Sequence, residues 1–201
     1  MAEIELIDPE RIRPEIENKL GRRGFLRSAG TATLSATAVA MIAGCESLAK
    51  DQMAAGGSAN DIRILNTALG AEHEAIAAYQ VGAESGLLQK PVLNLAVQFQ
   101  GHHKEHVSIL SKTVSQLGGK PVPAKAKYGF PVSKLKKQAD VLAFAASLEK
   151  GAVSAYLGAV PLFANRDLAK AAASILGDEA MHWAVLRGAL GQNPVPAAFV
   201  S

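Results

Sequence analysis

The chain has 201 residues, a formal net charge of +3 and 49% hydrophobic residues, with only 5% aromatic residues. A chain of this length and composition can bury one good-sized core, so we expect one domain. The single cysteine, Cys45, excludes an intramolecular disulfide framework and any zinc or iron–sulfur site that needs several thiolates. Because the sequence contains no known nucleic-acid-binding module, we expect no nucleic acid among its partners.

Residues 1–44 have the pattern of an export signal. Residues 22–27 read RRGFLR, and residues 28–44 carry no charge. This uncharged segment is weakly apolar and shorter than the roughly 20 apolar residues of a spanning helix, which favours a signal peptide. The arginine pair resembles a twin-arginine translocation signal, and residues 42–45, IAGC, resemble a bacterial lipobox. These resemblances imply an exported protein in the periplasm or cell envelope, anchored to a membrane through a lipidated Cys45.

Residues 45–60 are small, polar and rich in glycine, which predicts a flexible tether. From residue 61 onward, apolar residues recur with helical periodicity and no alternating strand pattern is found. We expect helices over about 61–87, 91–117, 135–160 and 168–190. The chain is therefore predicted to be all-α.

The connections between the expected helices are short, long and short in turn. Short connections form antiparallel hairpins, whereas a long connection can cross the length of a bundle. We therefore expect an antiparallel four-helix bundle over residues 61–191, built from two hairpins joined by a crossover. Residues 192–201 are expected to form a C-terminal tail.

The chain contains an internal repeat that carries polar residues at matching positions. Residues 72–79 and 149–156 both read E-x-x-A-x-x-A-Y, and residues 101–110 and 177–186 share G-x-(H/E)-x-x-H-x-x-x-L. Residues three apart on a helix lie on one face, so both polar residues of each second motif can point inward. Buried carboxylates are costly unless cations accompany them, and histidine and carboxylate side chains are suitable metal ligands.

A Glu on each of two helices, with Glu-x-x-His on each of the other two, is the ligand set of the ferritin-like di-iron and di-manganese carboxylate proteins. Residues 61–190 resemble that superfamily, and more narrowly the exported ferritin-like domains of bacteria. The resemblance implies iron or manganese as cofactor, with O2 or peroxide as the small partner. Carried over position by position, it implies six metal ligands: Glu72, His103, His106, Glu149, Glu179 and His182. It also allows a homodimer.

His103 departs from this pattern, because it stands where the resemblance implies a carboxylate. With three carboxylates instead of four, the cluster is about one positive charge richer, which should raise the reduction potential of a bound metal. The sequence pattern is therefore compatible with two bound ions, one ion or none. Glu105 lies beside His106 but about 100° around the helix, which makes it a poorer ligand.

Other polar residues of the repeat have alternative interpretations. Tyr79 and Tyr156 lie two turns from the carboxylates of their own helices, where they can hydrogen-bond ligand carboxylates or simply pack in the core. We expect His102 at the surface or beside a ligand, and Asp178 in solvent.

Two functions follow from the resemblance. The first is a redox metalloprotein whose dinuclear iron or manganese centre acts on O2 or peroxide, as an oxidase, a peroxidase or a catalase-like defence against oxidative stress. The second is a lipid-anchored binding or structural protein whose metal site is degenerate or only holds the helices together. The sequence does not choose between an enzyme and a non-catalytic protein.

Overall fold

The computed structural model describes residues 46–200 of the chain. The predicted export signal and the predicted lipidation site, Cys45, lie outside the described residues. The described part consists of α3 (Glu46–Glu84), α4 (Lys90–Gln116), η1 (Val132–Lys134), α5 (Gln138–Ala159), η2 (Val160–Leu162) and α6 (Arg166–Ala189), where η marks a short 3-10 helix. It contains no strand, so the all-α prediction is confirmed.

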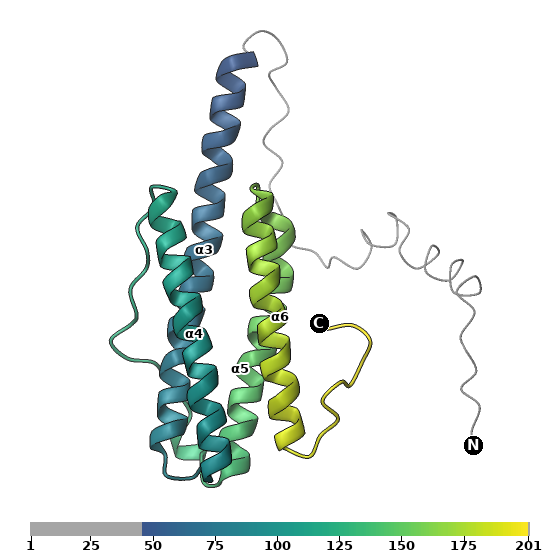
Figure 1. Ribbon diagram of the computed structural model, residues 1–201. Helices are drawn as coiled ribbons and strands as arrows, with labels where there is room; N and C mark the ends of the chain where they lie inside the picture. Colours follow the sequence, from purple (N-terminus) through teal and green to yellow (C-terminus); the bar gives the residue numbers. More distant parts are fainter. Residues whose placement is uncertain (1–45, 201) are drawn as a thin grey trace, which may run out of the picture. The chain divides into compact units, whose positions relative to one another are not determined.

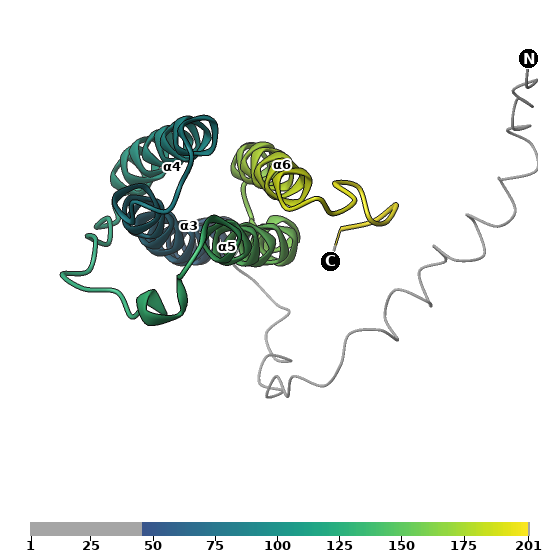
Figure 2. The same ribbon diagram turned by 90° about the horizontal axis from the view of Figure 1, so that it is seen from below.

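The four α-helices form a bundle of two hairpins. α3 packs mainly along α4 and α5 packs mainly along α6, while the contact between α3 and α5 is less extensive. Seen along the helices, the four ribbons surround a common interior (Figure 2). The long connection between α4 and α5 runs back along the length of the bundle (Figure 1). The structure therefore has the two hairpins and the crossover that the connection lengths predict.

α3 begins earlier than the sequence analysis predicts. Residues 46–60, for which we expected a flexible tether, continue the backbone of α3, so the helix starts at Glu46 and not near Asp61. Much of this segment consists of alanine, leucine and charged residues that favour helix, and the glycines at 56 and 57 do not interrupt it. None of the helices in the described part of the chain is long and apolar enough to span a membrane.

Two polar side chains of α3, the buried Asp61 and the half-buried Asn66, hydrogen-bond the loops of the bundle. Asp61 accepts hydrogen bonds from the backbone N–H groups of Ala164, at 2.8 Å, and Asn165, at 3.0 Å, immediately before α6 begins. Asn66 accepts a hydrogen bond from the Val122 N–H at 2.9 Å, at the start of the crossover. Both connections therefore depend on polar groups of α3, because their backbone N–H groups would otherwise lack these partners.

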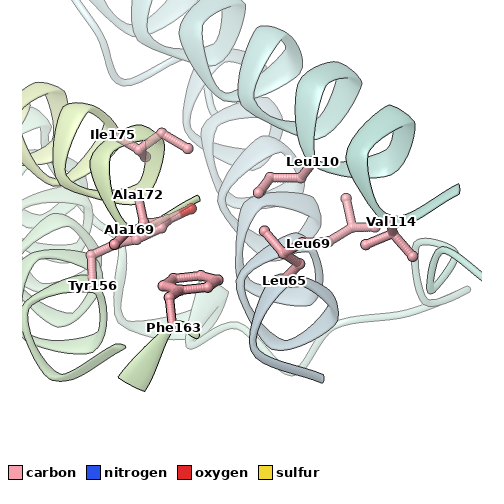
Figure 3. Close-up of a cluster of buried hydrophobic side chains, with 9 residues drawn as sticks. All are labelled: Leu65, Leu69, Leu110, Val114, Tyr156, Phe163, Ala169, Ala172 and Ile175. Atoms are coloured by element: carbon pink, nitrogen blue, oxygen red, sulfur yellow. The ribbon is translucent and has the colours of Figure 1, made fainter. Parts of the chain in front are cut away.

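The apolar core is divided into two clusters. The larger cluster contains nine buried residues that point toward one another from α3, α4, α5, α6 and the loop before α6 (Figure 3). The smaller cluster contains Tyr79, Phe99, Leu142, Ala146 and Leu186. On each of the four helices, the buried polar residues of the repeat lie between the two clusters in the sequence. The core therefore encloses a polar layer with apolar packing on either side.

Candidate metal centre

The structure brings the six residues that the sequence analysis named into this polar layer, which we call the inner cluster: Glu72, His103, His106, Glu149, Glu179 and His182. Five of the six are at most 2% exposed, and the His106 side chain is 13% exposed. Glu105, the neighbour of His106, is exposed and lies outside the cluster. The repeat thus places its polar side chains together, each helix contributing one or two.

The inner cluster contains two overlapping sets of donor atoms. One set comprises Glu72, His103, His106 and Glu179, and the other comprises His103, Glu149, Glu179 and His182; within each set the donor atoms lie within 4.8 Å of one another. His103 and Glu179 belong to both sets. Each set also has its own histidine and its own carboxylate, so the two hairpins supply a matched pair of half-sites.

Glu179 lies between the two sets. Its Oε1 atom is 3.3 Å from His106 Nδ1, and its Oε2 atom is 3.6 Å from His182 Nδ1. Neither oxygen accepts a hydrogen bond from a described residue, and burial raises the pKa of this carboxyl group. His182 Nδ1 also has no hydrogen-bond partner among the described residues.

Buried polar atoms are rarely left without partners in folded proteins, because such burial is costly. The atoms without partners are an imidazole nitrogen and two carboxylate oxygens, which are donor types that suit iron, manganese and zinc. The residues of the inner cluster therefore fit a transition-metal centre.

His103 occupies the other shared position and already has partners. Its Nδ1 atom is 2.8 Å from Glu72 Oε2, and its Nε2 atom is 3.3 Å from Glu149 Oε1. The imidazole ring therefore joins the carboxylates of the two hairpins directly. A carboxylate at this position could not do so, because an ionised carboxylate only accepts hydrogen bonds.

The three histidines hold their protons strongly in this environment. Burial lowers the pKa of His103, but hydrogen bonds to Glu149 and Glu72 outweigh burial and raise the pKa to about 10. By the same balance the pKa values of His106 and His182 rise to about 9. A metal ion must displace these protons in order to bind, so binding should strengthen as the pH rises.

The two tyrosines of the repeat bind the carboxylates across the bundle. The Tyr156 hydroxyl on α5 donates to Glu72 Oε1 on α3 at 2.6 Å, and the Tyr79 hydroxyl on α3 donates to Glu149 Oε1 on α5. Each hairpin thus orients the carboxylate of the other. Burial raises the pKa of both phenols, and the nearby carboxylates raise it further, so both remain protonated donors.

Two further residues lie next to the cluster, and only one of them, Asp178, was not expected there. The Asp178 Oδ2 atom lies 3.3 Å from His182 Nε2 and 3.5 Å from His106 Nε2, although the sequence analysis placed Asp178 in solvent. The His102 Nδ1 atom lies 2.8 Å from His182 Nε2. The i,i+4 spacing of Asp178 and His182 was a signal for this contact, because residues four apart are neighbours on a helix.

A cavity of about 540 Å³ reaches the inner cluster between α3 and α5. Small side chains such as Ala68, Ala75 and Ala155 line much of it, and Glu72 and Glu149 form part of its polar wall. The sequence did not predict this opening. It gives a small molecule room to approach the carboxylates of both hairpins.

Comparison with known proteins agrees with this architecture. Residues 60–192 match the family model described as the ferritin-like domain. The match covers more than half of the chain, so the chain belongs to the ferritin-like domain family. Among curated proteins, none matches the sequence.

Two solved structures are similar to this one. A conserved hypothetical protein from Mycobacterium tuberculosis is 24% identical, with a TM-score of 0.62, over 71% of this chain and 99% of its own. A structure of ferritin-like, diiron-carboxylate proteins from Bacillus anthracis str. Ames is 20% identical, with a TM-score of 0.56, over 67% of this chain and 97% of its own. At these identities, the similarity shows a shared fold.

Proposed function

We propose that this member of the ferritin-like domain family binds two redox-active metal ions, iron or manganese, in its inner cluster and uses them to react with O2 or a peroxide. The observation that carries the proposal is the buried Glu179 carboxylate, whose two oxygens lack hydrogen-bond partners among the described residues and face the two donor sets. The diiron-carboxylate structure from Bacillus anthracis supports the choice of metals.

Each half-site would hold one ion through its own histidine and carboxylate. Glu72 and His106 would serve one ion and Glu149 and His182 the other, while Glu179 would contact both. When bound, iron or manganese ions supply the electron transfer that no amino-acid side chain of the cluster can provide.

The surrounding residues would hold the ligands in place. The Tyr79 and Tyr156 hydroxyls fix one oxygen of Glu149 and Glu72 respectively, which leaves the second oxygen of each carboxylate for other partners. Fixed ligand orientation tunes both the affinity and the reactivity of a metal site. The cavity between α3 and α5 would admit the oxidant.

We also propose that the protein works outside the cytoplasm. The support is the order of features in residues 1–45: an arginine pair, an uncharged segment and a cysteine in a lipobox-like context. A lipidated Cys45 would lie next to the first residue of α3, so the helix would begin at the membrane anchor. A location in the cell envelope suits defence against peroxide.

A second function is favoured by His103. Its imidazole hydrogen-bonds Glu72 and Glu149 at once and can balance part of their charge without a metal. The alternative is therefore a non-catalytic, lipid-anchored protein in which the cluster, with or without a metal, only holds the helices together.

The experiment loads the full-length protein with Fe(II) or Mn(II), counts the bound ions and follows peroxide consumption. We expect two ions per chain, consumption of peroxide and loss of both properties in the E179A and H182A variants. E105A and H73A are matched controls, because they remove the same residue types outside the cluster. Metal whose oxidation state does not respond to peroxide would favour the non-catalytic alternative, and equal retention in E179A, H182A and the controls would rule out the centre.

A further inference from the structure

A second group of donor atoms lies on the α4–α6 side of the inner cluster. It consists of His102 on α4 with Asp178 and His182 on α6, whose donor atoms lie within 4.8 Å of one another. The side chains of His102 and Asp178 are 35% and 23% exposed, whereas His182 is buried. We call these three residues the outer group. It lies between solvent and the inner cluster.

The spacing of the outer group suits a transition-metal ion. Asp178 Oδ2 is 3.4 Å from His102 Nδ1 and 3.3 Å from His182 Nε2. Nitrogen and oxygen ligands of a tetrahedral zinc ion lie about 3.3–3.5 Å apart, because the metal–ligand bonds are about 2.0–2.2 Å long. The His102 Nδ1 and His182 Nε2 atoms are 2.8 Å apart, so they would have to separate by about half an ångström for both to bind one ion. His102 is exposed enough to move by that amount.

No hydrogen bond from the described residues explains why the Asp178 carboxylate lies among these imidazoles. The carboxylate has imidazole nitrogens of His102, His106 and His182 at 3.3–3.5 Å, yet it forms no hydrogen bond with any of them by distance and angle. Two nitrogen donors and one carboxylate oxygen favour divalent zinc, cobalt or iron over calcium and magnesium, which prefer all-oxygen sites.

His182 connects the outer group to the inner cluster. Its Nε2 atom faces Asp178 and His102, and its Nδ1 atom faces Glu149 and Glu179. Phe99 stacks on the ring, with centroids 4.0 Å apart, which keeps one nitrogen on each side. A neutral imidazole binds a metal through only one nitrogen, so His182 can serve an outer ion or an inner ion, but not both at once.

We propose that His102, Asp178 and His182 form an outer binding site for a divalent transition-metal ion, from which the ion passes to the inner cluster when the His182 proton leaves Nδ1, on the side of Glu149 and Glu179, and a proton returns to Nε2, on the side of Asp178. The binding step depends only on the three residues of the outer group. The delivery step rests on the proposed function, because it requires inner ions. The cation would enter between α4 and α6, on a different side from the cavity between α3 and α5.

Two measurements with Co(II), whose visible spectrum reports imidazole ligation, test the two steps separately. The first measures Co(II) bound to the full-length E72Q/E149Q/E179Q protein, in which the inner carboxylates are lost, with and without H102A or D178N. The second measures how fast the metal-free protein with an intact inner cluster takes up Co(II) at low concentration. H73A is the control for both, and circular dichroism checks that each variant is folded.

We expect the triple variant to bind one Co(II) and to lose it on addition of either H102A or D178N. In the protein with an intact inner cluster, the H102A and D178N variants should take up Co(II) on the order of tenfold more slowly than the H73A variant. All three should reach the same final number of bound ions. Co(II) binding by the triple variant that is unaffected by H102A and D178N would overturn the outer site. Unchanged uptake rates would overturn the delivery step, and if the triple variant does not fold, unchanged rates would overturn both. A protein that takes up no inner ion, while its triple variant still binds Co(II) through His102, would refute the proposed function and leave the outer site standing.

Discussion

The two hairpins of the bundle match at most positions of the inner cluster and differ at one. Glu72 and Glu149 correspond, as do Tyr79 and Tyr156, and each tyrosine donates to the carboxylate of the opposite hairpin. At the remaining shared position, α4 has His103 where α6 has Glu179.

The difference separates two roles that a symmetric site would combine. His103 hydrogen-bonds Glu72 and Glu149 without a metal, whereas both Glu179 oxygens lack hydrogen bonds from the described residues. One hairpin therefore supplies a residue that stabilises the metal-free cluster, and the other supplies the residue that most needs a cation.

The largest effect on metal affinity should come from changing Glu179, the residue that α6 supplies at this position. The Glu179→Gln substitution removes the negative charge shared by both donor sets, so affinity should fall at both positions by more than about 100-fold, the upper range for changes beside a ligand. Isothermal titration of the metal-free protein with Fe(II) or Mn(II) measures the effect, with Glu105→Gln as the matched control. Equal affinities in the two variants would show that Glu179 does not hold metal.

The metal-free protein should lose stability as the pH rises from 7 to 9.5. The pKa values of His103, His106 and His182 are about 10, 9 and 9 when folded, above the value of about 6.5 expected in the unfolded chain. The stability from these protonated histidines is fully present below pH 6.5 and is lost as the pH approaches 9 to 10. We expect the free energy of unfolding to fall by at least about 2 kcal/mol, because the pKa shift of any one of the three histidines corresponds to a loss of that size.

Urea unfolding at the two pH values measures this loss, and the H103Q variant measures the share that comes from His103. Since His103 has the highest pKa of the three, the variant should show a smaller loss than the wild type. A free energy of unfolding that stays constant or rises over this range would contradict the raised pKa values of the three histidines.

Restoring the symmetry of the two hairpins should produce a moderate gain in metal binding. The His103→Glu substitution supplies a fourth carboxylate, so affinity for divalent ions should rise about tenfold, and the reduction potential of a bound metal should fall. The same variant should be less stable without metal, because four carboxylates would then share one buried layer. Weaker metal binding in this variant would mean that His103 itself is the better ligand.

The smallest effect concerns the tyrosines. Tyr79→Phe and Tyr156→Phe each remove one hydrogen bond to a buried carboxylate, which should cost about 1–2 kcal/mol in the free energy of unfolding. Because the two bonds are reciprocal across the bundle, the two costs should agree within about 0.5 kcal/mol. A large difference in urea unfolding would show that the hairpins are less equivalent than their sequences indicate.

The fold and the inner cluster were accessible from the sequence because both follow from periodicity. Helical spacing places Glu179 and His182 on one face, and the repeat indicates that Glu72 and Glu149 face the same interior. The ligand roles remain a prediction until a metal is bound. The apolar residues on either side of each polar motif likewise predicted a helical core.

Other features depend on contacts that no local pattern encodes. Whether His102 and Asp178 meet depends on how α4 and α6 are rotated against each other, and this rotation is set by packing along their whole length. The cavity depends on how far apart α3 and α5 lie. Residues 46–60 were predicted as a tether because glycine and polar residues favour flexibility, but the preceding helix formers and the continuous bundle helix extend α3 through them.

Whether the inner cluster is a redox metal centre is tested most directly by the metal content of the protein purified from its native cell envelope. Elemental analysis should find two equivalents of iron or manganese per chain, and addition of peroxide should change the oxidation state of that metal. Zinc in their place, or no metal at all, would contradict a redox centre and leave the inner cluster as a structural element of the bundle.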